Sequence, residues 1–199
     1  MGTLFVDKLD PQSGTSLEIG SSGDTITIPS GCTITNNGTQ SGFGGVNTPA
    51  FEAYLSGSTQ VITNGTLTKI QFNTEAFDDG SCYDNSTNYR FTVPSGEAGT
   101  YTFYTHLNFE DNQNSQAIGW TQLAFYKNGS NFAFWWNDNG TAKAITSCYD
   151  GAQMTIPLVA GDYIEVYAAM NQTNGQNPSI GGYSNGNRYS VFGGHKIIR

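Results

Sequence analysis

Residues that could perform catalysis are few in this chain and form no recognisable motif. The sequence has only two histidines, His106 and His195, and neither lies in a Ser/His/Asp or metal-ligand pattern. Cleavage of a glycosidic bond needs two carboxyl groups at a set separation, which sequence alone does not give. The candidates for such a pair are Glu110, Asp111, Asp138 and Asp150. We therefore expect a protein that is not an enzyme.

Metal and redox sites receive equally little support. Asp78, Asp79 and Asp84 gather the acidic oxygens that Ca²⁺ prefers, but the EF-hand spacing is absent. A solvated turn is the preferred interpretation and a calcium site is the alternative, so we expect no cofactor. An odd number of cysteines without CxxC spacing indicates buried apolar side chains and neither a zinc site nor a disulfide framework. These cysteines are Cys32, Cys82 and Cys148.

A long polar loop, Met170 to Tyr189, is the best candidate for recognition. It is rich in Asn, Gly, Ser and Gln and contains a few tyrosines, a composition typical of antibody binding loops. Small polar residues supply adaptable hydrogen bonds there, and aromatic residues supply contact area. An ordinary exposed connection is the alternative. The predicted binding residues are Asn174, Tyr183, Asn185, Arg188 and Tyr189.

The elements that must position these residues are β-strands. The chain has 25 Gly among 199 residues and only 12% charged residues, a balance poor in helix formers and rich in turn formers. Residues 100–109 alternate, with His106 on the outward face. The predicted inward residues are Tyr101, Phe103 and Leu107. Asn128-Gly129 predicts a hairpin, because a tight primed turn needs two residues that tolerate positive φ. Short, regularly spaced strands predict an all-β jelly-roll sandwich.

The N-terminal part differs from the rest of the chain in composition and in residue pattern. Only Phe5 and Phe43 among the aromatic residues precede Val46, and residues 17–45 repeat two to four alternating residues followed by a turn. This spacing is typical of a narrow β-structure in which chains wind together, with a flexible linker as the alternative. We predict an attachment segment and β stalk over residues 1–45 and a head over residues 46–199. The predicted attachment residues are Leu4, Phe5, Val6 and Leu9.

Both parts predict self-association. The thin N-terminal segment has too little apolar bulk to bury a core of its own. Several strands of the head carry large apolar residues on both faces, so that one face is left over after the sandwich is filled. Large apolar patches are rarely left in water, which makes a subunit interface their natural place. The predicted interface residues are Trp120, Tyr126, Trp135 and Tyr167.

Charge and the N-terminal sequence exclude several partners. With a net charge of -8 and no basic run, the surface would repel phosphate backbones and anionic lipid. The first twelve residues lack a basic segment followed by an apolar stretch, and no run approaches membrane-spanning length. We therefore expect no nucleic-acid partner, no membrane insertion, and synthesis in a cytoplasm.

Six segments, in this order, resemble the globular head of complement component 1q and its tumour-necrosis-factor-like relatives. They are spread over residues 47–198 and include an opening PAF strand, an FN…YD segment, and a closing SVFGG strand. The segments are NTPAFEAYL (47–55), KIQFNTEAFDDGSCYD (69–84), NYRFTVPSGEAGTYTFYTHL (88–107), LAFYKNGS (123–130), MTIPLVAGDYIEVYA (154–168) and SVFGGHKI (190–197). This resemblance implies a ten-strand jelly roll that forms tight homotrimers.

The chain departs from that family in two places. Residues 132–147 form an unusual aromatic insertion, and the collagen stalk is absent. In its place, LFVDKLDPQSGTSLEIGSSGDTITIPSGCTI resembles the N-terminal segments of tailed-bacteriophage structural proteins. This second resemblance implies a virion protein, made in the host cytoplasm, whose partners are itself, other phage virion proteins and a host surface glycan or protein. A short tail fibre is the leading hypothesis, a capsid decoration or cement trimer the second, and a polysaccharide-degrading spike the third.

Overall fold

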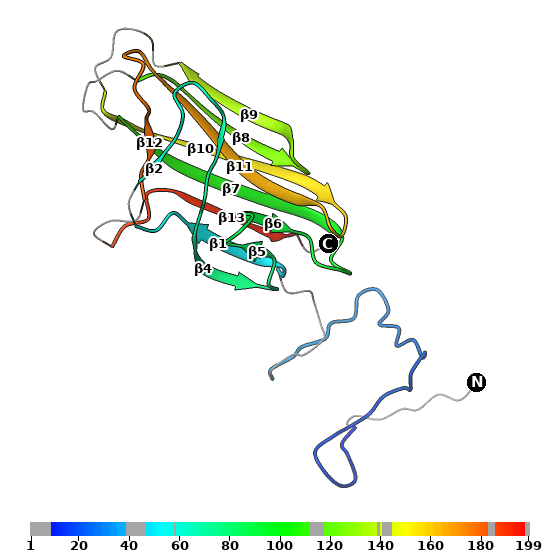
Figure 1. Ribbon diagram of the computed structural model, residues 1–199. Helices are drawn as coiled ribbons and strands as arrows, with labels where there is room; N and C mark the ends of the chain where they lie inside the picture. Colours follow the sequence, from blue (N-terminus) through cyan, green and yellow to red (C-terminus); the bar gives the residue numbers. More distant parts are fainter. Residues whose placement is uncertain are drawn as a thin grey trace. The chain divides into compact units, whose positions relative to one another are not determined.

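The computed structural model shows two antiparallel β-sheets packed as a sandwich in the C-terminal part of the chain (Figure 1). The structure describes residues 9–38, 47–57, 59–111, 118–138, 140, 145–182 and 186–197, which form thirteen strands and no helix. The strands are β1 (Ala50–Tyr54), β2 (Gln60–Val61), β3 (Thr68–Lys69), β4 (Thr74–Asp79), β5 (Tyr83–Asp84), β6 (Arg90–Thr92), β7 (Gly99–Glu110), β8 (Ile118–Lys127), β9 (Ser130–Asp138), β10 (Ser147–Leu158), β11 (Tyr163–Gln172), β12 (Ser179–Ile180) and β13 (Val191–Lys196). The predicted β-sandwich is confirmed.

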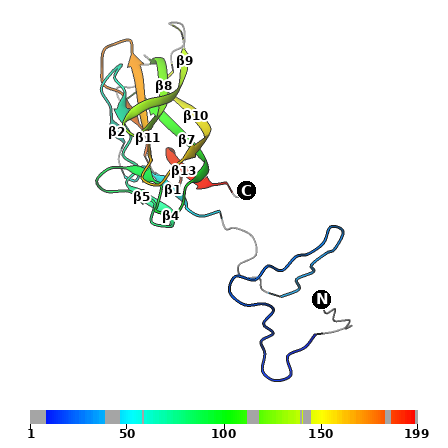
Figure 2. The same cartoon turned by 90° about the vertical axis from the view of Figure 1, so that its right-hand side faces the viewer.

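The five longest strands are divided between the two sheets, with β7 and β10 in one and β8, β9 and β11 in the other. The seven-stranded sheet runs β2-β12-β7-β13-β1-β4, with β10 on the other side of β7, and the six-stranded sheet runs β5-β6-β11-β8-β9, with β3 paired to β11. Figure 2 shows the same strands turned by 90°. The resemblance implied ten strands, and the structure has thirteen, four of which are only two residues long: β2, β3, β5 and β12. β9 and β10 are therefore edge strands of their sheets.

Aromatic rings from both sheets fill the core. Phe51 of β1 is fully buried, and its ring centroid lies 5.0 Å from Tyr83, 5.4 Å from Phe91 and 4.9 Å from Phe192. The inward residues predicted for 100–109 are all buried and His106 is exposed, so that alternation is confirmed. Burying a phenylalanine contributes about 1.5–3 kcal/mol, and each well-placed ring pair adds about 0.5–1.5 kcal/mol. The core therefore accounts for part of the aromatic content of the head.

The predicted Asn128-Gly129 hairpin joins β8 to β9. Both residues have positive φ, 51° and 77°, as a primed two-residue turn requires. The Asn128 side chain donates to Asp162 Oδ1 at 2.7 Å and accepts from the Tyr163 backbone N–H at 2.9 Å. Hydrogen bonds from Asn128, the Val159 backbone and Lys127 lower the pKa of Asp162 to about 2. The turn is thus tied to the loop that leads into β11.

The N-terminal residues that the structure describes form no strands. The chain divides into two units, Met1–Phe43 and Gly44–Arg199. Residues 9–38 contain turns, bends and irregular segments, and all of their side chains are exposed except that of Pro11, which is half-buried. The short alternating runs carry little apolar area and find no partner strand within the single chain, so the predicted β-repeat is not formed there. Of the predicted attachment residues, Leu9 is exposed, whereas Leu4, Phe5 and Val6 lie outside the described residues.

No helix in the described ranges has the length and apolar character needed to cross a membrane.

Candidate functional site

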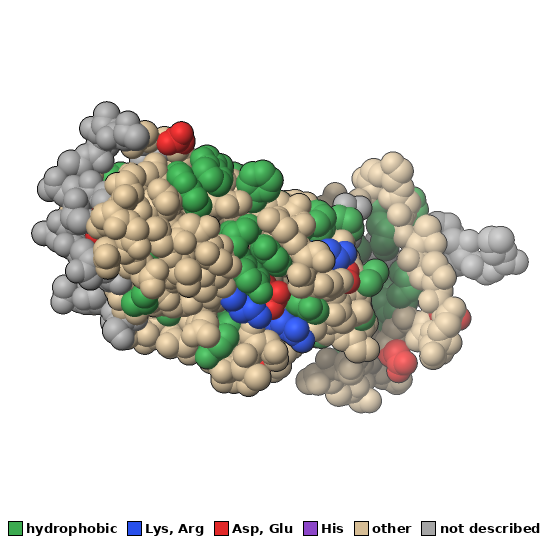
Figure 3. Space-filling view, turned by 45° about the horizontal axis from the view of Figure 1, so that its top comes forward, with side chains coloured by type: hydrophobic (Ala, Val, Ile, Leu, Met, Phe, Trp, Pro, Cys, Tyr) green, Lys and Arg blue, Asp and Glu red, His purple; other side chains and the backbone are tan. Residues whose placement is uncertain are grey.

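The outward side of the six-stranded sheet carries a group of large aromatic side chains, which we call the aromatic face. Alternation along β8 turns Leu123 and Phe125 into the core, so their neighbours point outward. Pairing with β9 and β11 brings further rings to the same side. The aromatic face comprises Trp120, Tyr126, Phe134, Trp136 and Tyr167. Figure 3 shows hydrophobic side chains gathered on one side of the head, next to Lys or Arg and Asp or Glu side chains.

The rings of this face are held in stacked pairs. Trp120 and Trp136 stack with centroids 4.3 Å apart and an interplanar angle of 27°, and Tyr126 and Tyr167 stack at 4.0 Å and 24°. Trp136 is 53% exposed although its partner is half-buried. Burial, and then the nearby Glu165 carboxylate, raise the pKa of Tyr167, so its hydroxyl stays protonated at neutral pH. The face therefore presents fixed, partly exposed rings to solvent.

Charged groups beside these rings are paired with one another. Lys69 Nζ forms an ion pair with Glu165, donates to the Asn88 carbonyl at 3.2 Å, and lies 6.0 Å from the Tyr167 ring centroid. The Arg90 guanidinium lies 4.0 Å from the Tyr163 ring centroid. Such cation–π contacts contribute about 0.5–1 kcal/mol at exposed sites. The Lys69 and Glu165 charges therefore cancel beside the aromatic face, whereas the Arg90 guanidinium lies against the Tyr163 ring.

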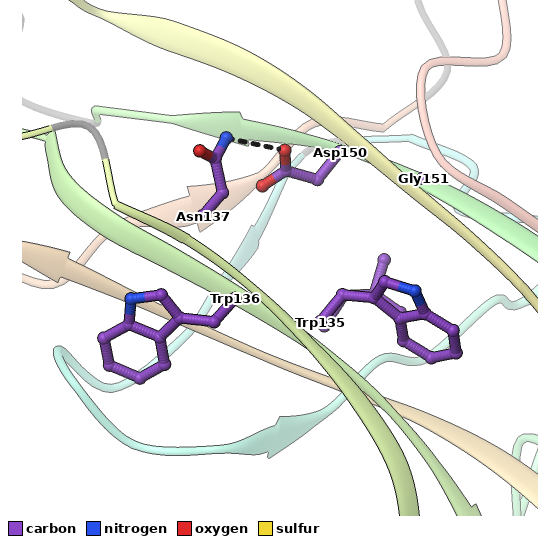
Figure 4. A pocket seen from close by; sticks show the side chains of 6 residues that line it. Trp135, Trp136, Asn137, Asp150 and Gly151 are labelled. Atoms are coloured by element: carbon purple, nitrogen blue, oxygen red, sulfur yellow. Dashed lines mark hydrogen bonds between the residues drawn. The ribbon is translucent and has the colours of Figure 1, made fainter.

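The opposite side of β9 borders a separate cavity of about 200 Å³ between β9 and β10. Trp135 points to that side and meets core residue Phe125 edge-on, with centroids 5.6 Å apart. Asp150 of β10 accepts a hydrogen bond from Asn137 of β9 at 3.0 Å and another from the buried Thr121 hydroxyl. Figure 4 shows Trp135 and Trp136 on different sides of the β9 ribbon. The cavity is lined by Leu123, Trp135, Trp136, Asn137, Asp150 and Gly151.

The four predicted interface residues consequently lie on two surfaces. Trp120, Tyr126 and Tyr167 belong to the aromatic face, whereas Trp135 covers the edge of the core beside β10. The first three are half-buried and Trp135 is 36% exposed. Stacking within the chain accounts for part of the burial that the sequence assigned to a partner subunit.

The predicted recognition loop is shorter than the sequence suggested. β11 continues to Gln172 and β12 forms at Ser179–Ile180, so part of Met170–Tyr189 is sheet. Asn174 is exposed, and its side chain accepts from the Gln176 backbone N–H at 3.0 Å. Tyr189 is half-buried, and Tyr183 and Asn185 lie outside the described residues.

Arg188, the charged residue of that predicted site, contacts the outward side of the seven-stranded sheet. It forms an ion pair with Glu52 at 2.7 Å, and its guanidinium lies 4.7 Å from the Tyr54 ring centroid. The Tyr104 hydroxyl donates to the other Glu52 oxygen at 2.8 Å. Burial and these contacts with Glu52 raise the pKa of Tyr104. A ligand that uses Arg188 would have to compete with Glu52 for it.

The candidate catalytic carboxylates each have a local structural role. Asp111 is buried and accepts from the Gln172 amide at 2.8 Å, and Glu110 accepts from the Asn108 amide at 2.6 Å. Burial raises the pKa of Glu110. Asp138 at the end of β9 accepts from the Gly140 backbone N–H at 2.9 Å. His106 and His195 lie on β7 and β13, where their neighbours are strand residues of one sheet.

The acidic residues near β4 and β5 stabilise turns. Asp78 accepts from the backbone N–H groups of Cys82 at 2.9 Å and Tyr83 at 3.1 Å. Asp84 accepts from the backbone of residues 86–88, which lowers its pKa, and Asp79 pairs with Ala50 in the sheet. Within the described ranges no three His, Cys, Asp or Glu side chains form a group that could hold a metal ion. The structure therefore does not bring these three aspartates together as ligands, and the expected absence of a cofactor stays a prediction.

The three cysteines have different surroundings. Cys82 is buried and donates to Asp78 Oδ1 at 3.0 Å, and Cys148 is half-buried. Burial raises the pKa of both thiols, to about 12 for Cys148. Cys32 is exposed, so the prediction of a buried side chain is wrong there, because no core forms around residues 9–38.

Sequence reasoning missed the charged residues that border the aromatic face. Lys69 and Glu165 are 96 positions apart, and Arg90 reaches Tyr163 across the β6–β11 pair. No local pattern marks these residues. The only sequence signal was the outward position of Glu165 in an alternating strand, with Tyr163 and Tyr167 on the same side.

The strand order and the two packed sheets define a jelly-roll head of the complement-1q and tumour-necrosis-factor type, as the sequence resemblance implied. No family model and no curated protein matches the sequence. Among solved structures, the globular domain of zebrafish complement 1qA is similar with a TM-score of 0.53 and 19% identity, covering 76% of this chain and 99% of that domain. Eiger, a tumour necrosis factor from S. frugiperda, matches with a TM-score of 0.51 and 11% identity over 74% of this chain and 91% of that one. Murine APRIL matches with a TM-score of 0.51 and 10% identity, over 74% of this chain and 98% of that one. These similarities establish the fold.

Proposed function

We propose that this chain is a non-enzymatic virion protein of a tailed bacteriophage, a homotrimeric short tail fibre whose head binds the host cell surface. The fold supports a trimer, because heads of this type typically form homotrimers. The N-terminal sequence that resembles phage structural proteins supports the virion assignment. Residues 1–45 attach the protein to other virion proteins, and the head is displayed.

The observation that carries self-association is the pair of edge strands on one side of the sandwich. β9 and β10 are nine and twelve residues long, and each pairs along one side only among the described strands. Long edge strands expose unpaired backbone groups, and soluble proteins usually cover or charge them. Here the edge also carries Trp135 and the cavity between the sheets. A second copy packed on this edge would cover the backbone groups and close the cavity.

The mass of the purified full chain tests the trimer. Light scattering coupled to size exclusion should give three times 21.4 kDa. Replacing Trp135 by Glu should shift the mass towards that of the monomer, because a charge would then be buried at the interface. Tyr149→Glu on the same edge is a second variant, since Tyr149 is exposed in the single chain. A monomeric wild-type chain would refute the trimer.

Position and copy number in the particle test the virion assignment. Labelled antibody should locate the head at the tail, and virions that lack the protein should adsorb poorly to cells. A copy number in the hundreds with the head on the shell would instead support a capsid decoration trimer. Adsorption that is normal without the protein would refute the tail-fibre assignment.

A further inference from the structure

We infer that the aromatic face of the six-stranded sheet is a binding surface for neutral carbohydrate chains. The C–H face of a sugar ring is weakly positive and packs against the negative face of an aromatic ring. Trp136 and Phe134 are 53% and 61% exposed, and both lie on the outward side of β9. The site is therefore distinct from the predicted loop of residues 170–189. It extends the proposed host-surface binding but depends on neither the trimer nor the virion assignment.

The rings are already fixed before any ligand arrives. Trp120 supports Trp136 from below at 4.3 Å, and Tyr126 and Tyr167 fix each other at 4.0 Å. Between these pairs, Ala124 points to the same side and is fully buried, directly opposite Tyr167 and Phe134 in the sheet. Ordering a side chain on binding is unfavourable, and preorganised rings avoid much of this loss. A weakly bound, flat ligand benefits most from such preorganisation.

Hydrogen-bonding groups lie among the rings. Gln122 and Asn171 are half-buried and share the outward side with Trp120, according to the β8–β11 register. Primary amides donate and accept hydrogen bonds, which matches the hydroxyl groups of a sugar. The stacked pairs are separated by about 14 Å, given one strand spacing and about four residues along the strands. The surface is therefore long enough for several sugar units.

Charge favours a neutral carbohydrate over an acidic one and over a protein. Lys69 and Glu165 neutralise each other beside Tyr167, so this pair adds no net positive charge there to attract an anionic chain. The whole sequence carries a net charge of -8, which repels one. Centres of protein interfaces are depleted in charged residues, whereas an ion pair borders this face beside Tyr167. A glycan bordering the ion pair can leave it hydrated.

Fluorescence titration of the full chain tests the inference, because the only three tryptophans, Trp120, Trp135 and Trp136, lie in or next to the face. The probes are neutral oligosaccharides of glucose, mannose, galactose and N-acetylglucosamine, with a sulfated oligosaccharide for comparison. At least one neutral probe should change the emission saturably. The dissociation constant should rise about tenfold in W136A, since one lost ring contact corresponds to about 1.4 kcal/mol. Binding by the variants is measured by calorimetry, which does not depend on the removed fluorophore.

The variants are chosen so that folding does not decide the outcome. Phe134→Ser removes a second exposed ring and should weaken binding in the same direction, whereas Tyr149→Ala, an equally exposed aromatic on β10 outside the face, should change affinity by less than about twofold. Absence of binding by every neutral probe, or unchanged affinity in both W136A and F134S, would overturn the inference. So would binding of the sulfated probe alone, or a lower oligomer mass in W136A. A monomer that still binds sugar would refute the trimer and leave this inference standing.

Discussion

The ion pair between Lys69 and Glu165 gives the sharpest test of how the outward side of the six-stranded sheet is built. The Glu165 side chain is only 5% exposed, and the Lys69 side chain is 29% exposed. Removing one member of a buried pair destabilises a protein by about 3–5 kcal/mol, because the remaining charge stays buried without a partner. Since Lys69 is partly solvated, we expect a destabilisation at the lower end of this range. Lys69→Met should therefore lower the free energy of unfolding by about 3 kcal/mol.

Thermal and urea unfolding at neutral pH, followed by near-UV circular dichroism, measure this change. For a chain of this size, 3 kcal/mol corresponds to a melting temperature lower by roughly 6–12 °C. The double variant K69M/E165M removes both charges and should recover most of the loss. Lys196→Met is the matched control, because its partner Glu97 is 41% exposed and can be hydrated; it should lose less than about 1 kcal/mol.

Two outcomes would contradict the reasoning. A free energy of unfolding of K69M within about 0.5 kcal/mol of the wild-type value would mean that Glu165 is hydrated in the folded protein. A double variant no more stable than K69M would mean that the loss comes from another contact of Lys69, such as its hydrogen bond to the Asn88 carbonyl at 3.2 Å.

Three further outcomes can be checked with the same protein. The pKa of Asp162 falls from 3.8 to about 2 on folding, so its contribution to stability is complete above about pH 4 and is lost as the pH falls towards 2. In D162N the free energy of unfolding should depend less on pH in this window. An unchanged pH profile in D162N would exclude this role of Asp162. Gly129→Ala should lower the free energy of unfolding in urea by about 1–2 kcal/mol, because φ is 77° there and an L residue with a Cβ is strained at positive φ. A neutral effect would contradict the primed turn. At pH 7 a maleimide should label Cys32 alone in the native chain, and Cys148 and Cys82 only after unfolding; rapid native labelling of a second thiol, seen by mass spectrometry, would disprove their burial.

Local patterns predicted the sandwich well. Alternation over 100–109 identified its buried residues, and Asn128-Gly129 identified the hairpin, because side-chain direction in a strand and positive φ in a turn depend on neighbouring residues. Residues 9–38 show the same kind of pattern but form no strands in the single chain, and a stalk built from several chains stays a prediction. A strand needs a partner, and alternation alone does not supply one.

The candidate site was only partly predictable. Trp120, Tyr126 and Tyr167 were identified correctly as aromatic residues that the core does not absorb. Their stacking was not predictable, because each ring meets its partner diagonally across two strands. Tyr183 and Asn185, two residues of the predicted loop site, lie outside the described residues, and that part of the loop stays a prediction.

Composition and periodicity by themselves determined that this chain makes an all-β head with an aromatic core and a surplus of rings. Only the tertiary structure decided which of the remaining aromatic residues lie on the outward side of the six-stranded sheet and which lie at the edge of the core. A shift in register between Phe125 and Tyr126 sets which residues of β9 face β8, so that Trp136 joins the aromatic face while Trp135 closes the edge of the core. The distinction arises because a shift of one residue exchanges the two faces of a strand, and register is fixed by pairing between strands.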